Sequence, residues 1–349
     1  MSDPRPTLDL APGWAWFRSG VGYHLDNLSR WLVWHVPTAL AASYAWFWAP
    51  RAPRLGVRPG WKFAEEYYPQ QRWLARRRGA LWEAARETGL RVALSVRWHS
   101  GTIVNVTLGN DNSLCLYVCG SFEPNEFAFL DRTLKPGMVF IDVGANDGYY
   151  TLFAARKVGP GGRVLAIEPS SREREHLRRN LERNAIANVA VVPVALGAVA
   201  VTAELKLADG LHAGHNTLGD FAHNDVVAAG TERVLVETLD SLAGRLEMTR
   251  IDVVKIDVEG AEASVIAGAR GVLTSMRPLL LLEIDDGALR AQRNSAQSLL
   301  ATLRDELDYE ILAFSPVTGL LERPAEGAPL SSNIVAAPRN RSAEILNKA

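Results

Sequence analysis

The sequence predicts an α/β protein whose central sheet is mostly parallel and covered by helices on both faces. Apolar runs rich in Val, Ile and Leu recur between residues 138 and 285, and stretches with helical periodicity separate them. The runs show little alternation of apolar and polar residues, which is typical of strands buried on both faces. We expect strands within Met138–Gly144, Arg163–Pro169, Val189–Gly197, Asp252–Gly260 and Pro278–Asp285.

Other stretches are expected to extend this sheet or to add to it. The connection at about 198–250 is too long for one crossover, and two runs within it predict an inserted antiparallel pair. Glu123–Leu134 looks helical, and the turn-type cluster GNDN predicts a β-hairpin between the runs that flank it. The inserted runs are Val201–Asp209 and Glu232–Asp240, the hairpin runs are Thr102–Leu108 and Leu114–Val118, and the closing strands are Tyr309–Ser315 and Asn333–Pro338.

Composition divides the chain near residue 100. The whole chain has a net charge of −1, but residues 1–100 hold 13 Arg and one Lys against seven Asp and Glu, so the remainder carries −8. All ten tryptophans lie between Trp14 and Trp98. We therefore expect a mainly helical, Trp/Arg-rich accessory segment over 1–100, a second domain over 101–340 and a tail over 341–349.

The accessory segment contains a stretch that could meet a membrane. Residues 31–50 include no formally charged side chain, and this stretch has about the length of a membrane span. However, Pro37 and five alanines make it weakly hydrophobic. A membrane span, an interfacial helix, and helices packed on the second domain all remain open; tryptophans at both ends favour the interface over the span. Arg72–Gly89 predicts a second amphipathic helix, whose arginine run is typical of a solvated face. Residues 14–98 are thus candidates for peripheral membrane contact.

The two cysteines and the N-terminal residues indicate a cytoplasmic protein. Cys115 and Cys119 lie four apart, too far to form a bridge along one strand, and we expect buried thiols in a reducing compartment. No secretory signal is recognised, because the first apolar run begins at Trp31 and three aspartates precede it. The expected location is the cytoplasm, with peripheral contact to the inner membrane surface.

The first predicted strand ends at two closely spaced glycines. In "VFIDVGANDGYYT", Gly144 and Gly148 allow the backbone to turn sharply and to approach a ligand, and the helix that follows offers free N–H groups. A dinucleotide fingerprint would need a glycine where Asn146 stands, which argues against NAD. Asp142, at the end of the strand, suits an ammonium group better than a pyrophosphate.

Glu168 ends the second predicted strand, 20 residues after Gly148. An acidic residue at that place can accept both hydroxyls of a ribose. An amino-acid ammonium together with a ribose describes S-adenosylmethionine. The alternative is a tight strand–helix turn without a ligand, in which Asp142 is a cap and Glu168 a solvated strand end.

Five blocks together resemble one protein family. "DVVKIDVEGAE", with "GMVFIDVGANDGYYT", "AIEPS", "ETLDSL" and "RPLLLLEID", resembles the FkbM-type methyltransferases over roughly residues 120–338. The resemblance implies a Rossmann-like class I methyltransferase sheet of seven strands with a reversed last strand, S-adenosyl-L-methionine as cofactor, and methyl transfer to oxygen. It also implies that Asp142, Gly144 and Asn146 hold the methionine end, Glu168 the ribose, and Ala195 and Leu196 the adenine.

The fourth predicted strand carries candidates for the chemistry. Lys255, Asp257 and Glu259 alternate with apolar residues and so share one face. An alcohol is a poor nucleophile, so a proton acceptor is needed near the acceptor oxygen. Asp257 is the first candidate base, with Glu259 orienting the acceptor, and His215 in the insertion is the other candidate. The alternative is an ion pair of Lys255 with Asp257 or Glu259 that only fixes the strand end.

Three further acidic positions have weaker interpretations. Glu283 and Asp285 end the fifth strand and could join Asp257 in a divalent-cation site, but no complete ligand set is visible and no metal is expected. Glu262 fits the first turn of a helix, where the dipole favours it. Asp240 is expected to cap a short helix before the fourth strand.

The expected function is methyl transfer to a hydroxyl of a sugar, glycolipid or secondary metabolite. An N- or protein methyltransferase is the second hypothesis, and a non-catalytic membrane-surface adaptor that retains the cofactor fold is the third. We expect a small-molecule, glycan or glycolipid acceptor as the partner. Nucleic acid is not expected, because the acidic second domain lacks a basic surface.

Overall fold

The computed structural model describes residues 28, 31, 38–50, 55–62, 64–68, 73–89, 92–212, 214–222, 226–325, 327 and 329–348. The chain forms two compact units: unit 1 comprises residues 1–54 and 62–123, and unit 2 comprises residues 55–61 and 124–349. The division therefore falls at residue 123 rather than near residue 100, because the strands on either side of residue 100 pair with each other. The rest of the accessory segment before residue 38 lies almost wholly outside the described residues.

Unit 1 combines helices with one two-stranded antiparallel sheet. In that sheet Ala93 pairs with Thr107 and Arg97 with Ile103. No helix among the described ranges is long and apolar enough to cross a membrane. The described elements are α3 (Thr38–Trp48), α4 (Ala64–Tyr67), α5 (Trp73–Thr88), β1 (Ala93–Arg97), η2 (His99–Gly101), β2 (Ile103–Thr107), α6 (Asp111–Ser113) and η3 (Leu114–Cys119).

The prediction of a β-hairpin at the GNDN cluster is wrong for its second strand. β2 forms, but its partner is β1, and Leu114–Cys119 is a π-helix. The side chain of Asn110 accepts a hydrogen bond from Ser113 N and so starts a helical turn where a hairpin turn was expected. All six residues of η3 are buried, so the apolar run reflects burial rather than β structure. Both cysteines are buried free thiols, as expected.

The amphipathic helix α5 forms as predicted, but its arginines are not simply solvated. Leu81 and Trp82 are buried, and so is Arg77, at 2% exposure. Arg78 Nε donates to Trp48 O at 2.7 Å, and the Tyr117 hydroxyl donates to Ala45 O at 2.9 Å. The carbonyls at the C-terminal end of α3 therefore find side-chain donors, which explains why part of the arginine run turns inward.

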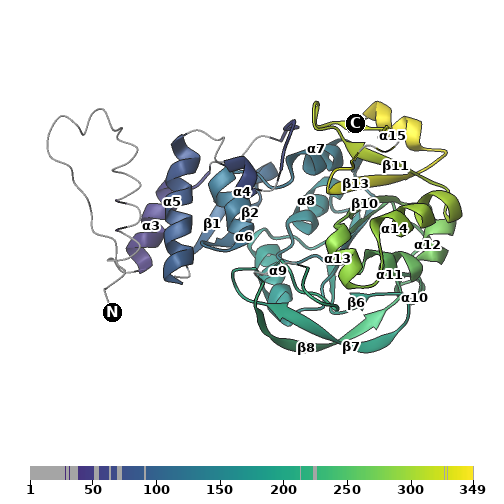
Figure 1. Ribbon diagram of the computed structural model, residues 1–349, viewed down its shortest axis with the longest axis horizontal. Helices are drawn as coiled ribbons and strands as arrows, with labels where there is room; N and C mark the ends of the chain where they lie inside the picture. The colour runs from purple at the N-terminus through teal and green to yellow at the C-terminus, as the bar shows by residue number, and fades with distance from the viewer. Residues whose placement is uncertain are drawn as a thin grey trace. The chain divides into compact units, whose positions relative to one another are not determined.

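Unit 2 is built on an eight-stranded sheet with the order β12-β11-β13-β10-β9-β3-β4-β5 (Figure 1). The five predicted strands are parallel neighbours, and β13 runs antiparallel to both β10 and β11, which confirms the reversed last strand. The eighth strand, β12, has only two residues. The strands are β3 (Val139–Val143), β4 (Arg163–Ile167), β5 (Val189–Val192), β9 (Val253–Ile256), β10 (Leu279–Glu283), β11 (Tyr309–Phe314), β12 (Leu321–Glu322) and β13 (Asn333–Pro338).

Helices cover both faces of this sheet. On one face, Ile141 and Val143 of β3 belong to a hydrophobic core that also contains side chains of the helices α10 to α14. On the other face, Phe127 stacks on Tyr150 with ring centroids 4.4 Å apart. The helices are α7 (Pro124–Thr133), α8 (Tyr149–Val158), α9 (Ser171–Arg183), α10 (Leu239–Arg245), α11 (Glu262–Ala267), α12 (Arg270–Ser275), α13 (Asp286–Ala291), α14 (Ala296–Ala301), η4 (Thr302–Glu306) and α15 (Ser342–Lys348).

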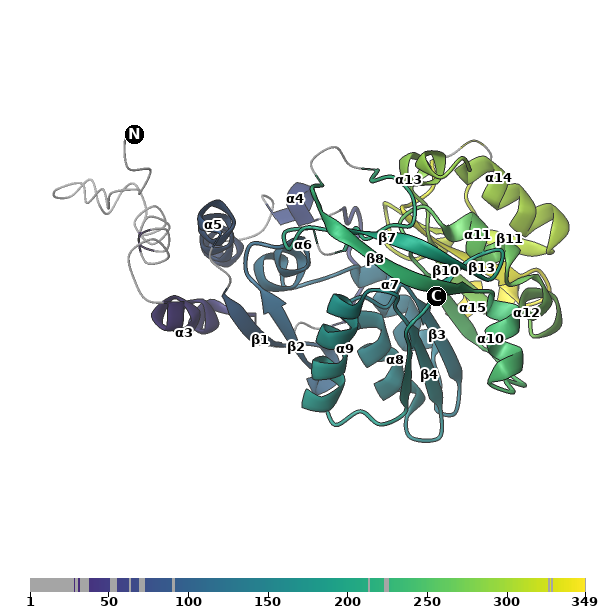
Figure 2. The ribbon, with the colours of Figure 1, turned by 90° about the horizontal axis from the view of Figure 1, so that it is seen from below.

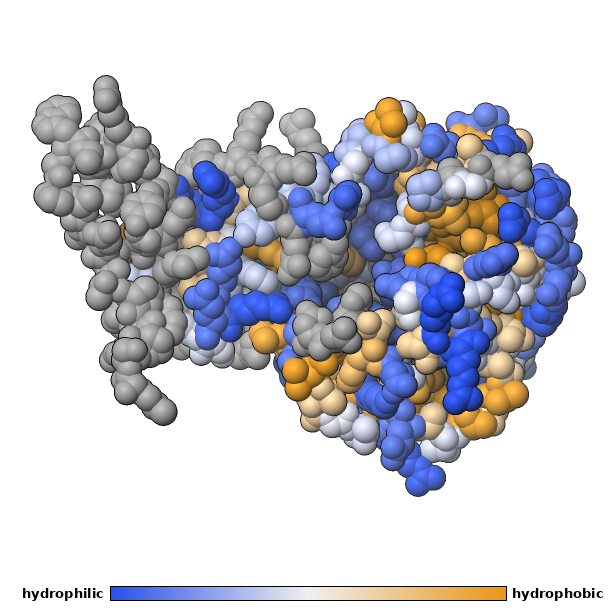
Figure 3. Space-filling model, viewed as in Figure 1, coloured by the Kyte–Doolittle hydropathy of each residue, from blue (hydrophilic) through white to orange (hydrophobic). Residues whose placement is uncertain are grey.

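The insertion forms a separate three-stranded sheet, β6 (Ala195–Leu196), β8 (Ala228–Glu237) and β7 (Val201–Ala208). The predicted antiparallel pairing of β7 with β8 is confirmed (Figure 2). Ala195 and Leu196 pair in parallel with β8, so they leave the main sheet instead of ending its third strand. Apolar patches lie among hydrophilic ones on this part of unit 2 in the view of Figure 3; exposed apolar residues of the insertion are Val199, Val201, Val227 and Leu235.

Asp240 caps a helix other than the expected one. Thr238 is the N-cap of α10 and its side chain accepts from Ser241 N. The carboxylate of Asp240 accepts from Gly271 N at 2.8 Å and from Val272 N at 2.7 Å, the free N–H groups at the start of α12. This carboxylate therefore ties α10 to α12 across one face of the sheet.

Candidate active site

The turn after β3 requires both of its glycines. Gly144 has φ +79°, and a Cβ there would overlap Asp257 O, so the loops after β3 and β9 run against each other. Gly148 has φ +88°, and a Cβ there would overlap the side chain of Leu177 in α9. A left-handed conformation and a close approach occur together at each position, which only glycine satisfies without strain. The turn therefore lies at the carboxyl edge of the sheet, where ligands bind in such folds.

Asp142 lies fully buried beneath this turn. The hydroxyl of Thr151 donates to its Oδ2 at 2.6 Å, and Lys255 Nζ lies 3.9 Å from its Oδ1. Burial raises the pKa of Asp142, and the nearby Lys255 opposes that rise. Oδ1 has no hydrogen-bond partner among the described residues. A buried acceptor without a donor is costly, so this atom suits a ligand that brings a cationic donor.

Glu168 connects the ends of β3 and β4. It accepts from Asn146 N at 2.9 Å and from Ser170 N at 2.8 Å, one bond to each carboxylate oxygen. Burial raises its pKa to about 7, although the two N–H groups favour the charged form. Each oxygen retains a second lone-pair direction, so the carboxylate can still accept a hydroxyl.

The residues expected beside the adenine are enclosed by the protein. Ala195 packs with side chains of the insertion, and Leu196 belongs to the core of the main sheet. Their side chains are 6% and 2% exposed. Their role next to a ligand ring stays a prediction.

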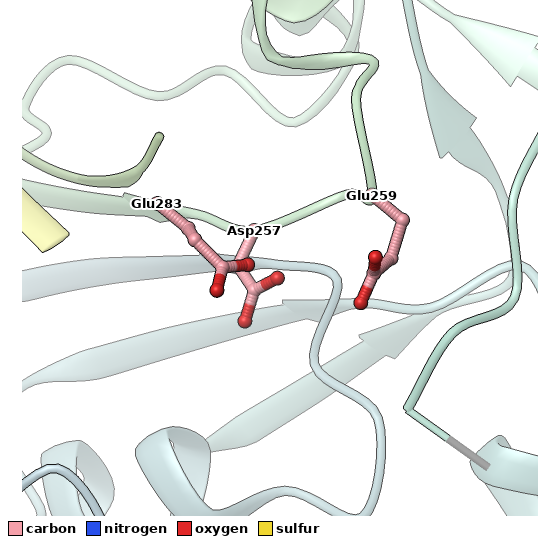
Figure 4. Close-up of side chains that lie close together, drawn as sticks. All are labelled: Asp257, Glu259 and Glu283. Atoms are coloured by element: carbon pink, nitrogen blue, oxygen red, sulfur yellow. The ribbon is translucent and has the colours of Figure 1, made fainter. Parts of the chain in front are cut away.

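The end of β9 gathers charged groups from two strands. Lys255 Nζ donates to Asp257 Oδ2 at 2.8 Å, so the predicted ion pair is present. Carboxylate oxygens of Asp257, Glu259 and Glu283 lie within 4.8 Å of one another (Figure 4). Asp285 does not join them, because its side chain caps α13 by accepting from Ala288 N.

The environment of Asp257 makes it a weak base. Burial alone would raise its pKa, but Lys255 and a hydrogen bond with Glu283 lower the pKa below the ordinary value. Asp257 is thus an ion-paired, hydrogen-bonded carboxylate with a reduced tendency to take a proton.

His215 comes from the loop of the insertion and meets Glu259. Its Nδ1 lies 3.2 Å from Glu259 Oε1, with both side chains partly exposed. A Cβ on the neighbouring Gly214 would lie 3.7 Å from Asn146 Nδ2, so this loop lies next to the turn after β3. His215 and Glu259 also line a shallow pocket together with Thr217, Phe221, Ala222 and Val226.

Sequence reasoning did not single out Thr151 or Phe221. Thr151 lies in the first turn of α8, three residues after Gly148, and that position alone points it back at the strand end. For Phe221 the sequence carries no signal, because its place depends on how the insertion folds.

The fold and this site define a protein class. A mostly parallel sheet with a reversed last strand, a glycine turn after its central strand and a buried carboxylate after the next strand are the features of Rossmann-like, S-adenosylmethionine-dependent methyltransferases. The buried Oδ1 of Asp142, which has no hydrogen-bond donor among the described residues, fits a ligand with an ammonium group, as this cofactor has.

Residues 142–311 match the model of the methyltransferase FkbM domain, so this part of the chain is an FkbM-type methyltransferase domain. The resemblance seen in the sequence is confirmed over these residues, and with it the class of this domain, an S-adenosylmethionine-dependent methyltransferase domain.

Relatives are distant or matched over part of their length. The AMB antimetabolite synthetase AmbE of Pseudomonas aeruginosa is 29% identical over 201 residues, which are 49% of this chain and 9% of that protein. Methyltransferase sdnD of Sordaria araneosa is 30% identical over 154 residues, 37% of this chain and 59% of that protein. The crystal structure of methyltransferase FkbM from Methylobacillus flagellatus superposes with a TM-score of 0.37 and 18% identity, covering 59% of this chain and 47% of the other.

Proposed function

We propose that the protein transfers a methyl group from S-adenosylmethionine to a hydroxyl group of a sugar, glycolipid or secondary metabolite. The observation that carries this proposal is the His215–Glu259 pair, whose Nδ1 and Oε1 lie 3.2 Å apart; it joins the insertion loop, which lies beside the turn after β3, to the loop after β9. A histidine oriented by a carboxylate is the arrangement that a general base for an alcohol needs.

The residues at the sheet edge divide the work. The cofactor supplies an electrophilic methyl group on a sulfonium. Asp142 and the turn at Gly144 hold the methionine end, and Glu168 accepts the ribose hydroxyls. His215 takes the proton of the acceptor hydroxyl at an imidazole nitrogen, and Glu259 stabilises the imidazolium that forms. Asp257 is the weaker candidate for the base, because Lys255 and Glu283 already engage its carboxylate.

The pocket beside His215 supports a hydroxylated acceptor with an apolar face. Phe221 and Val226 offer apolar surface, while His215 and Glu259 offer hydrogen-bonding groups. Sugars combine C–H faces with hydroxyls and match such a lining. The name of the synthetase relative, an antimetabolite synthetase, also supports a secondary-metabolite acceptor.

The test begins with calorimetric titration of the full chain with S-adenosylhomocysteine, with NAD as the control ligand. We expect micromolar binding of S-adenosylhomocysteine and no binding of NAD. Methyl transfer is then measured on a panel of glycans, glycolipids, amines and peptides; transfer to an amine or peptide only would favour the N- or protein methyltransferase. Cofactor binding without any turnover would favour the adaptor.

The base is tested with His215→Gln. We expect kcat to fall about 10²–10⁴-fold with unchanged affinity for S-adenosylhomocysteine. A variant that keeps the wild-type rate would move the role of base to Asp257.

We also propose that unit 1 contacts an anionic membrane surface peripherally, on the cytoplasmic side. Trp46 and Phe47 of α3 are 66% and 63% exposed, and aromatic side chains of this kind settle at lipid interfaces. Sedimentation with phosphatidylserine vesicles tests this: the wild type should sediment and Trp46→Ser/Phe47→Ser should not. Leu235→Ser, in the insertion, removes another exposed apolar side chain, at 57% exposure, and should behave as the wild type. A wild-type protein that does not sediment with the vesicles would contradict the proposal.

A further inference from the structure

Gln292, the C-cap residue directly after α13, packs in a space that two glycines leave free. A Cβ on Gly219 would lie 2.6 Å from its Cγ, and a Cβ on Gly260 would lie 3.0 Å from its Nε2. Gly260 also has φ +97°, and a Cβ there would overlap Ala288 O. The glutamine therefore packs between the insertion and the loop after β9, where a larger neighbour at either glycine would displace it.

The amide nitrogen of Gln292 joins a small hydrogen-bond network. Its Nε2 donates to Glu259 O at 2.8 Å and to Thr217 Oγ1 at 3.2 Å. The Thr217 hydroxyl donates to the same carbonyl at 3.1 Å and accepts from Gly219 N at 3.1 Å. A hydroxyl has one donor and two acceptor directions, and all three are taken here. Such a network has one arrangement, which fixes the groups that it joins.

The network acts on the residue that faces His215. Glu259 has φ +53°, a conformation that costs a residue with a side chain about 1–3 kcal/mol unless its surroundings hold it. Two donors, from Gln292 and Thr217, bind its carbonyl oxygen and stabilise this conformation. Thr217 is itself 2% exposed and is bound to Lys206 of β7 through both backbone groups. The insertion loop and the loop after β9 are therefore fixed to each other at the backbone.

We propose that Gln292 and Thr217 are positioning residues that hold Glu259 against His215. Both residues act through the backbone of Glu259. This inference rests on the proposed role of His215 as the base, but the His215–Glu259 geometry can be measured without turnover. Loss of the amide donor of Gln292 or of the hydroxyl donor of Thr217 lets Glu259 relax from its left-handed conformation, and its carboxylate then leaves the imidazole.

The test compares Gln292→Met, which keeps the length of the side chain but removes its donors, with Gln297→Met, the same change on the exposed surface of α14. In the cofactor-free protein, the midpoint of the His215 imidazole titration, followed by NMR, should fall by about half a pH unit or more in Gln292→Met, because an anionic neighbour is lost. kcat should fall about tenfold with little change in cofactor KM. Gln297→Met should leave both unchanged.

A second pair of variants, at Thr217, distinguishes a loss of positioning from misfolding. Thr217→Val removes the hydroxyl at constant shape and should repeat the effect of Gln292→Met, while Thr217→Ser keeps the hydroxyl and should recover most of the rate. A wild-type titration midpoint in both Gln292→Met and Thr217→Val would overturn the inference. A shifted midpoint together with full activity of His215→Gln would instead uphold the positioning and refute His215 as the base.

Discussion

The two loops that meet at the carboxyl edge of unit 2 are held in different ways. The loop after β3, residues 144–148, is held by Glu168, which lies 22 positions from Asn146 and ends the neighbouring strand. The loop after β9, residues 257–260, is held by Thr217 and Gln292, which lie 42 and 33 positions from Glu259. The first loop depends on one β-α-β segment, and the second on the insertion and α13.

This difference separates cofactor binding from acceptor chemistry. Within the segment from β3 to α9, the turn and its partners can form together, whatever the rest of the chain adds. The His215–Glu259 pair exists only when the insertion docks on the strand end. Substitutions in the first region should therefore affect cofactor affinity, and substitutions in the second should affect the rate.

Gly144→Ala should have the largest effect, because Gly144 is where the two loops touch. A Cβ there overlaps Asp257 O, at a φ of +79°. We expect a loss of more than about 3 kcal/mol of stability and no measurable binding of S-adenosylhomocysteine. Urea denaturation and calorimetry check this. Gly161→Ala, in open space, should change neither; equal behaviour of the two variants would show that the loops do not touch.

Glu168→Gln should weaken the cofactor without affecting the acceptor region. Loss of a charged acceptor costs about 1–3 kcal/mol of binding free energy, measured by titration with S-adenosylhomocysteine. Ribose hydroxyls favour the charged form of Glu168, whose pKa is raised to about 7. Affinity in the wild type should therefore increase as the pH rises through 7, and the variant should lose this dependence. Unchanged affinity in the variant would remove Glu168 from the cofactor site.

Stability of the free protein should depend on pH in the opposite direction. Burial raises the pKa of Glu168 and of Glu262 to about 7, against ordinary values of 4.5. Between pH 4.5 and 7 the folded state therefore binds protons that the unfolded state releases, and the contribution of these groups to stability falls as the pH rises. Denaturation at pH 5.5 and 8, followed by circular dichroism, checks the sign. The double variant Glu168→Gln/Glu262→Gln should show a flatter profile, and an unaltered slope would contradict this cause.

Asp257→Asn should have the smallest effect on catalysis. Asp257 keeps Lys255 in place, and Lys255 can still interact with Asp142, 3.9 Å away. We expect kcat to stay within about tenfold of the wild type, since in the proposed mechanism His215 takes the proton, and single-turnover measurements check this. A loss as large as that of His215→Gln would mean that both regions share the chemistry.

The sequence predicts the cofactor region of this site better than the acceptor region. Gly144 and Gly148 stand where the backbone needs φ above zero, and Glu168 stands at a strand end, so local pattern and spacing indicate them. The strand order and the reversed last strand follow from the apolar runs and the resemblance to the FkbM-type family. These features need no knowledge of contacts between distant residues.

Other features depend on partners that the sequence does not indicate. Gln292 lies 75 positions from Thr217, and nothing in its surroundings sets it apart from an exposed glutamine. Asp240 caps a helix 32 positions away, although a helix begins directly beside it. Leu114–Cys119 has the composition of a buried strand and forms a π-helix, because burial alone does not decide between the two.

The π-helix of unit 1 also provides a chemical reporter. The only two cysteines of the chain are both buried in it, and burial raises the pKa of Cys115 well above its usual range. Such thiols react with alkylating reagents only when the surrounding structure opens. Because unit 2 contains no cysteine, the alkylation rate follows the opening of unit 1 alone. The stability of unit 1 can thus be followed separately in the intact chain, without an introduced label.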